Sequence, residues 1–329
     1  MKLSSYLQPL LLGYYNHYRQ PTRRLALVVG MLPWHDMVGD WVLEPSHVQI
    51  QRRFSKPYFH LWLKPFIKQV NPVIYIWGYK APDYFIDYIR KQDLDVFFLE
   101  DGFIRSAPDD EPGAPPLSIV MDSQAPYFDT TRPNDLTDLI ANFDFEQSGY
   151  DEALAQEMLD YYVSHRVSKY NHQPYVDVIP IYGDKDRTRI LVLGQVPHDD
   201  SLKYGGGVGI TLLDVVNQAI IANPEAQIIV KPHPMTLDDA SIVNTLTELN
   251  CLVLTQSIHL IDALETIDYV YTITSLGGFE ALLRGKKVTV LGRPFYANWC
   301  NYNNSNNLES NRPSLSQLFY ICYYSYHFK

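Results

Sequence analysis

The chain has 329 residues, a formal net charge of −10 at pH 7 and 46% hydrophobic residues. This length fits two α/β domains better than one, and the acidic balance argues against bulk nucleic-acid binding. Three irregularly spaced cysteines match no metal motif and favour a reducing compartment. No apolar run reaches the roughly 18–20 residues of a transmembrane helix and no signal peptide is evident, so we expect a cytoplasmic protein.

Aromatic and cationic residues are mixed near the N-terminus, at Tyr14, Tyr15, Tyr18, Arg19, Arg23 and Arg24. Such mixtures occur in segments that lie on a membrane surface, and peripheral contact with a membrane is one interpretation. An ordinary packed surface helix is the simpler one.

The first half of the chain alternates strand-like and helical patterns. Strands are predicted at residues 25–29, 73–77, 96–99 and 117–121, and helices at 84–91, 134–142 and 150–163. Strands separated by helices indicate a parallel sheet with right-handed crossovers. The polar segment 165–186 is expected to link two domains.

A second alternation begins at residue 190 and is typical of a Rossmann-like domain. Strands are predicted at 190–193, 226–230, 251–254, 269–272 and 288–291, and helices at 211–222, 240–249, 258–264 and 279–284. We therefore expect an α/β fold with one domain over residues 1–170 and another over 171–299. Residues 300–329 form an atypical tail, rich in Asn and aromatic residues, without a clear period.

Polar residues follow several predicted strands, which is where α/β proteins build ligand sites. In Lys231-Pro232-His233-Pro234 the prolines restrict the backbone and fix the directions of the cation and the imidazole. That arrangement suits a phosphate group. A rigid loop with a surface lysine explains the pattern equally well.

Other polar pairs also have two interpretations. Asp199 and Asp200 follow the strand at 190–193, and one of them could act as a nucleophile or general base, although adjacent acids in loops are usually solvated. Thr274 and Ser275 can cap the next helix or bind a phosphate with its amides. Glu280, one turn later, is either a ligand for ribose hydroxyls or a solvated carboxylate.

Two further features stay open. The glycine run at 205–209 precedes a predicted helix and is either an anion site or a flexible turn, and its spacing is not the dinucleotide fingerprint. Glu100 and Asp101 precede Arg105, and these charges are either structural or bind an acceptor hydroxyl.

Five blocks follow one another between about residue 70 and Trp299: EDGFIRS, PPLSIVMDSQAPYFDTTRPNDL, GQVPHDDS, KPHP and TSLGGFEALLRGKKVTVLGRPFYANW. Together they resemble the bacterial capsule polysaccharide biosynthesis proteins that act as β-Kdo transferases. The resemblance implies a GT-B architecture, with two Rossmann-like domains facing a central cleft. It also implies retaining transfer of Kdo (3-deoxy-D-manno-oct-2-ulosonic acid) from CMP-Kdo to a lipid-linked acceptor, with no metal or other cofactor.

The resemblance also suggests roles for individual residues. The catalytic candidates are Asp199, with Asp200 as the alternative nucleophile, and His233 at the leaving phosphate. The donor-binding candidates are Gln195, Lys231, Pro234, Thr274, Ser275, Gly278 and Glu280. Acceptor-side or Kdo-side candidates are Glu100, Asp101 and Arg105.

The sequence leaves two alternatives to this function open. One is a GT-B transferase for another CMP-sugar, such as a sialic acid, because both donors share the cytidine phosphate and the anomeric carboxylate. Another is a degenerate, non-catalytic paralogue that binds a glycolipid or a capsule assembly protein. The tail at 300–329 supports the second alternative, because it departs from the ending expected for the family.

Overall fold

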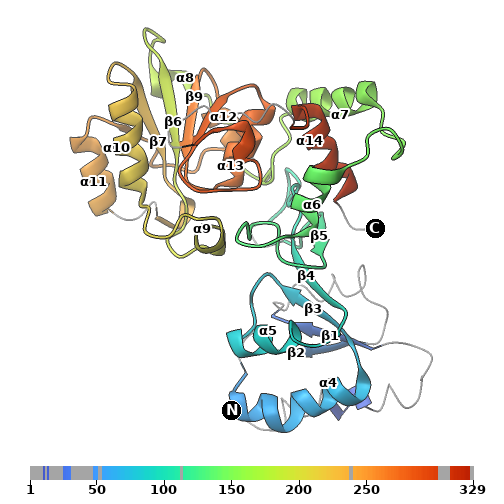
Figure 1. Ribbon diagram of the computed structural model, residues 1–329. Coiled ribbons are helices and arrows are strands. Elements are labelled where there is room, and N and C mark those ends of the chain that lie inside the picture. The colour runs from blue at the N-terminus through green and yellow to red at the C-terminus, as the bar shows by residue number, and fades with distance from the viewer. Residues whose placement is uncertain are drawn as a thin grey trace. The chain divides into compact units, whose positions relative to one another are not determined.

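The computed structural model describes residues 10–11, 13–14, 25–30, 47–50, 54–111, 114–236, 240–302 and 312–326. Its contacts divide the chain into two compact units (Figure 1). The first comprises Met1–Gly102, Gly113–Pro126 and His327–Lys329, and the second comprises Phe103–Pro112 and Tyr127–Tyr326. The division therefore falls near residues 103 and 127, not at the predicted boundary of residue 170.

The first unit contains a five-stranded sheet in the order β2-β1-β3-β4-β5. Its strands are β1 (Ala26–Val29), β2 (His47–Ile50), β3 (Val73–Trp77), β4 (Val96–Asp101) and β5 (Ile119–Asp122). The first four are parallel, whereas β5 runs antiparallel to β4. The predicted all-parallel arrangement fails at β5, because no crossover helix separates it from β4.

Two helical segments accompany this sheet. A continuous run is formed by α3 (Lys56–Tyr58), η2 (Phe59–Leu63) and α4 (Lys64–Val70), and α5 (Asp83–Ile89) follows β3. The run begins at Ser55, whose hydroxyl accepts the Tyr58 N–H at 3.3 Å, and ends at Asn71 in the left-handed region. The sequence pattern does not predict this run, because two prolines and several aromatic residues obscure the helical period.

The second unit contains a six-stranded sheet in the order β11-β10-β9-β6-β7-β8, with all pairs parallel. Its strands are β6 (Arg189–Leu193), β7 (Gln227–Lys231), β8 (Leu252–Val253), β9 (Tyr269–Thr272), β10 (Lys287–Val290) and β11 (Asn301–Tyr302). The inner residues of the central strands are apolar and buried, as expected for parallel strands covered on both faces. The predicted α/β class with two Rossmann-like sheets is confirmed.

Helices surround the second sheet and occupy the segments before and after it. They are α6 (Asp135–Asn142), α7 (Glu152–Ser164), α8 (Ile179–Tyr182), α9 (Asp200–Tyr204), α10 (Leu212–Ala222), η3 (Pro234–Thr236), α11 (Ala240–Glu248), α12 (Leu260–Ala263), α13 (Leu276–Leu283), η4 (Ala297–Trp299), α14 (Leu315–Tyr320) and η5 (Ile321–Ser325). α10 packs Val215, Val216 and Ala219 against β6, β7 and β9, and α13 packs on β9 and β10.

The predicted linker at 165–186 belongs to the second unit. The Tyr182 hydroxyl donates to the carbonyl of Ala263 at 2.8 Å. The guanidinium of Arg189, which is 1% exposed, donates to the carbonyl of Gly183 at 2.5 Å. These buried polar contacts tie the segment to the sheet, which composition alone did not indicate.

The C-terminal segment is folded where the structure describes it. Ser314 and Gln317 form a capping box at α14, and Leu318, Ile321 and Cys322 are fully buried. The Tyr323 hydroxyl donates to that of Tyr162 in α7 at 3.0 Å. A clear 3.6-residue period was not found here, because half of the segment is the π-helical turn η5.

Candidate functional site

The candidate site is at the carboxyl edge of the second sheet. β6 lies between β7 and β9, so the residues that follow these three parallel strands meet at one edge. Gly194 allows the loop after β6 to approach the segment after β7 closely. A Cβ at Gly194 would lie 3.1 Å from both the His233 backbone nitrogen and the Pro232 Cα. The glycine therefore lets the loop after β6 lie directly against the Lys231–Pro234 segment.

The side-chain amide of Gln195 cross-links this edge. Its Oε1 accepts the Thr274 N–H at 2.7 Å, and its Nε2 donates to the Thr274 hydroxyl at 3.0 Å and the Ser201 hydroxyl at 3.3 Å. Thr274 is 6% exposed. This amide thus joins the loop after β6 to the starts of α9 and α13. Ser201, which the sequence analysis did not select, was visible as the last residue of the GQVPHDDS block.

Asp199 and Asp200 lie at the start of α9, not in an open loop. The Asp199 carboxylate caps the helix by accepting the Ser201 N–H at 2.7 Å, and Asp200 is the first helical residue. The Asp199 side chain is exposed and close enough to His233 to stabilise the imidazolium form electrostatically. Asp199 therefore both caps α9 and interacts electrostatically with the imidazole.

His233 is half-buried, and its protonation follows from its surroundings. Burial lowers its pKa below the usual value, and the Lys231 charge lowers it further, while Asp199 partly opposes the shift. Its Nδ1 accepts the Met235 N–H at 3.2 Å. In the neutral ring the proton is therefore on Nε2, which donates to no residue in the described ranges. Burial also lowers the pKa of Lys231.

The start of α13 is fixed by hydroxyl groups. Ser275 caps the helix and accepts the Gly277 N–H at 3.2 Å. The Tyr296 hydroxyl donates to the Ser275 carbonyl, and a Cβ on Gly278 would lie 2.6 Å from that hydroxyl oxygen. The Tyr296 ring stacks on Phe279 at 5.7 Å. Gly278 thus makes room for the tyrosine that orients the first turn of α13.

Glu280 lies elsewhere. Its carboxylate is 3% exposed and accepts the Lys169 N–H at 3.3 Å and the Tyr162 hydroxyl at 3.4 Å. Burial raises the pKa of Glu280, and the Arg284 charge partly opposes this. The structure therefore places this predicted ribose ligand in a buried network with α7, not in the Gln195–Thr274 cross-link.

The three acceptor-side candidates are divided between the units. Glu100 and Asp101 belong to the first unit, where they are the last residues of β4 and pair with β5. They were expected just after a strand, but they lie within it. Arg105 belongs to the second unit, is 9% exposed, and donates its backbone N–H to the Lys169 carbonyl at 2.8 Å.

The glycine run does not form an anion site with α10. Thr211 and Asp214 form a capping box at that helix, and the Asp214 carboxylate accepts the Thr211 N–H at 2.7 Å. An acidic side chain at a helix N-terminus competes with any bound anion. Cβ atoms on Gly205 and Gly207 would lie 3.0 Å from Thr274 and 2.7 Å from Ile273, so these glycines serve close packing.

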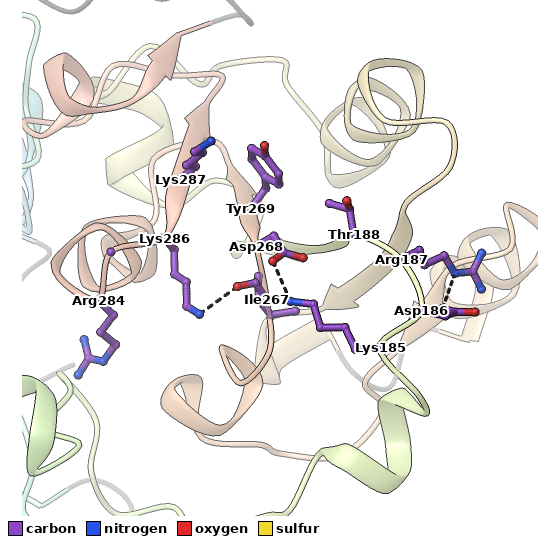
Figure 2. A pocket seen from close by; sticks show the side chains of 11 residues that line it. Lys185, Asp186, Arg187, Thr188, Ile267, Asp268, Tyr269, Arg284, Lys286 and Lys287 are labelled. Carbon is purple, nitrogen blue, oxygen red and sulfur yellow. Dashed lines mark hydrogen bonds and ion pairs between the residues drawn. The ribbon is translucent and has the colours of Figure 1, made fainter.

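A basic pocket of about 630 Å³ lies at the opposite, amino edge of the same sheet. Its lining includes Lys185, Arg187, Arg284, Lys286 and Lys287 with Asp186 and Asp268 (Figure 2). Lys185 donates to the Thr266 carbonyl and to Asp268, both at 2.8 Å, and Lys286 donates to the Ile267 carbonyl at 2.9 Å. None of the predicted site residues lines it. In the described ranges no group of three or more His, Cys, Asp or Glu side chains is placed to hold a metal.

The fold and the site define the class of this protein. It is an α/β protein with two mainly parallel sheets and with polar side chains gathered at a carboxyl edge. Residues 73–328 match the family model described as "Capsule polysaccharide biosynthesis protein". The chain belongs to this family. Because the match extends to residue 328, the expected departure of the tail from the family is wrong.

Two kinds of relatives support this assignment. Over 92% of its length the chain is 34% identical to "Lipopolysaccharide-processing protein LpsZ" of Rhizobium meliloti, covering 69% of that protein. It is 37% identical over 64% of its length to "Capsule polysaccharide modification protein LipA" of Neisseria meningitidis, of which it spans 30%. Thermosulfurimonas dismutans KpsC, a β-Kdo 2,4 transferase, has a similar structure, with a TM-score of 0.74, 27% identity and coverage of 93% of this chain and 92% of that one.

Proposed function

We propose that this protein is a retaining β-Kdo transferase that moves Kdo from CMP-Kdo to a lipid-linked acceptor in capsule or surface polysaccharide biosynthesis. The observation that carries the proposal is the structural likeness to the KpsC β-Kdo 2,4 transferase over nearly the whole of both chains. The cross-linked carboxyl edge around Gln195 and Thr274 supplies a rigid place for the donor.

The donor phosphate is assigned to the segment before α13 and to the end of β7. The Thr274 and Ser275 hydroxyls and the backbone N–H groups that the cap of α13 leaves unused offer hydrogen-bond donors, and Gly278 makes room for the tyrosine that orients this turn. Lys231 supplies positive charge, and Pro234 is kept as a proposed donor-side residue. The Nε2–H of neutral His233 donates to the departing phosphate. Phosphate is a weak base, so departure needs this hydrogen bond and no proton transfer.

Retention of configuration is explained by two displacements. The Asp199 carboxylate attacks the anomeric carbon of Kdo, the bond to the CMP phosphate breaks, and CMP leaves with the bonding electrons. An acceptor hydroxyl then attacks the same carbon, loses its proton to a base and releases Asp199. Asp200 is the alternative nucleophile. Glu100, Asp101 and Arg105 are proposed to bind acceptor or Kdo, and Glu280 ribose.

The proposal is tested with purified protein, CMP-Kdo and a β-Kdo glycolipid, with products read by mass spectrometry. A Kdo-extended glycolipid is expected, and CMP-sialic acid in a parallel reaction should give none. Transfer from CMP-sialic acid alone would instead support the other CMP-sugar class. CMP binding by folded protein without any transfer would support a non-catalytic paralogue.

A further inference from the structure

Charge is divided unevenly along the chain. Residues 1–82 contain ten Lys and Arg and three Asp and Glu, a net charge of +7. The remaining 247 residues contain 17 Lys and Arg and 34 Asp and Glu, a net charge of −17. No acidic residue occurs between Glu44 and Asp83. A basic region confined to one part of an acidic protein points to an anionic partner for that part.

The described part of this region includes the continuous helical run Lys56–Val70, which we name the basic helix. Its buried side carries Phe59, Leu63 and Phe66, each no more than 2% exposed, in the core of the first unit. The helix labelled α4 in Figure 1 is its second half. The core contacts fix which side of the basic helix faces outward.

The outward side of the basic helix includes large apolar side chains. Leu61 is 68% exposed and the adjacent Trp62 is 47% exposed, and two prolines on the same helix are also exposed. Leu11, which is 66% exposed, lies on a helical segment whose Tyr14 ring contacts Phe66 at 5.0 Å. The side of a helix that faces water normally carries charges of both signs. Large apolar side chains that are exposed at adjacent positions therefore indicate a surface that binds a partner.

Basic residues border these apolar side chains. They recur at every fourth position and therefore follow one stripe of the helix: Lys56, His60, Lys64 and Lys68. The Nζ atoms of Lys56 and Lys64 lie 5.7 and 5.2 Å from the ring centres of Tyr84 and Tyr88 in α5. None of the three lysines forms an ion pair with a carboxylate of the described residues. The ammonium groups can thus meet an external anion.

We propose that the basic helix docks the first unit on the surface of an anionic phospholipid bilayer. Leu61 and Trp62 enter the headgroup region, and the lysine stems lie along it with their ammonium groups on lipid phosphates. The proposed contact is a surface contact, and no helix in the described ranges is long and apolar enough to span a bilayer. This contact involves only residues of the first unit and does not depend on the transfer chemistry.

Sedimentation with lipid vesicles tests the proposal. The full chain is mixed with vesicles of phosphatidylcholine alone or with about 30% phosphatidylglycerol, an anionic lipid content that gives a negative surface potential. Binding is expected only to the anionic vesicles and should weaken as salt rises. The pair Leu61→Gln and Trp62→Gln should weaken binding about tenfold. The pair Lys64→Gln and Lys68→Gln should weaken it by about fivefold per lysine.

Matched controls lie in the second unit. Tyr175→Gln with Ile221→Gln removes side chains that are 67% and 80% exposed, and Lys185→Gln with Lys287→Gln removes two charges from the basic pocket. Both controls should bind like the wild type. The proposal is overturned if the basic-helix variants, shown by circular dichroism to be folded, bind normally, or if the pocket variant loses binding. Transfer of Kdo to a lipid-free acceptor, measured in parallel, tests the proposed function separately.

Discussion

At the amino edge of the second sheet, cations donate mainly to backbone carbonyls, whereas at the carboxyl edge polar side chains bind one another. Lys185 and Lys286 each donate to a carbonyl of the segment before β9, and Arg189 is fully buried among acceptors. At the other edge Gln195 holds Thr274, and the Nε2–H of His233 donates to no described residue. The first arrangement stabilises the fold, and the second leaves a donor for a ligand.

The largest effect is expected from a substitution at the carboxyl edge, at Asp199. Asp199→Asn should reduce Kdo transfer by at least about 10³-fold, because the amide cannot act as the nucleophile. Thermal stability should be nearly unchanged, since Asn caps helices as well as Asp does. Asp200→Asn is the matched control and should retain activity within about threefold. Normal transfer by Asp199→Asn, or a large loss only in Asp200→Asn, would reassign the nucleophile.

The next effect concerns the hydrogen bond to the leaving phosphate. His233→Ala should lower transfer about 10²-fold, and His233→Gln should recover part of it because its amide also donates. Steady-state kinetics at varied CMP-Kdo concentration measure the transfer rates of both variants. Equal loss in the two variants would show that the imidazole is needed for something other than donation.

The cross-link offers a test of rigidity. Gln195→Leu removes the partner of the Thr274 backbone N–H and one of the two partners of its hydroxyl, so it should lower unfolding stability by about 1–3 kcal/mol and transfer about tenfold. Denaturant unfolding and initial rates measure the two. Thr274→Val, which keeps the backbone donor, should have a smaller effect on both. An unchanged denaturant midpoint for Gln195→Leu would mean that the stability of the carboxyl edge does not depend on the cross-link.

The lowered pKa of His233 predicts a pH dependence with a definite sign. The folded state disfavours the imidazolium, so the contribution to stability is complete above the unfolded pKa near 6.5 and is lost as pH falls through the folded pKa. Transfer should stay constant from about pH 6.5 to 8 and decline only below that range. A rate profile would measure this, and a decline on the alkaline side of pH 7 that vanishes in His233→Gln would identify the imidazolium as the active form.

The smallest effect is expected at the amino edge. Lys185→Met removes a half-exposed ion pair with Asp268, so stability should fall by no more than about 1 kcal/mol and transfer should not change. Chemical denaturation and the transfer assay check this together. A reduced rate at unchanged stability would show that the basic pocket takes part in the reaction, and the comparison between the two edges would then be incorrect.

The predicted strands of both sheets were largely correct, because buried parallel strands are short apolar runs that end in glycine or polar residues. β3 and β9 match their predicted bounds. Prediction failed for the basic helix, for α14 with η5 and for the linker. In these segments aromatic residues, prolines or π-helical geometry replace the 3.6-residue period, and packing against distant residues decides the structure.

The site was predictable only in part. Strand ends indicated where Gln195, His233 and Thr274 lie, since parallel strands bring their carboxyl ends to one edge. Spacing could not show that Glu280 turns into a buried network with Tyr162, because the choice depends on α7, 118 residues away along the chain. Likewise, the proton on Nε2 of His233 follows from one backbone contact that no motif specifies.

Kdo transfer by the wild type beside Asp199→Asn and Asp200→Asn tests the central claim most directly. Each purified protein is incubated with CMP-Kdo and a β-Kdo glycolipid, and the extended product is measured by mass spectrometry after CMP binding and folding are verified. The account predicts product from the wild type and from Asp200→Asn, and almost none from Asp199→Asn. Equal product from all three, or none from a folded wild type that binds CMP, would contradict it.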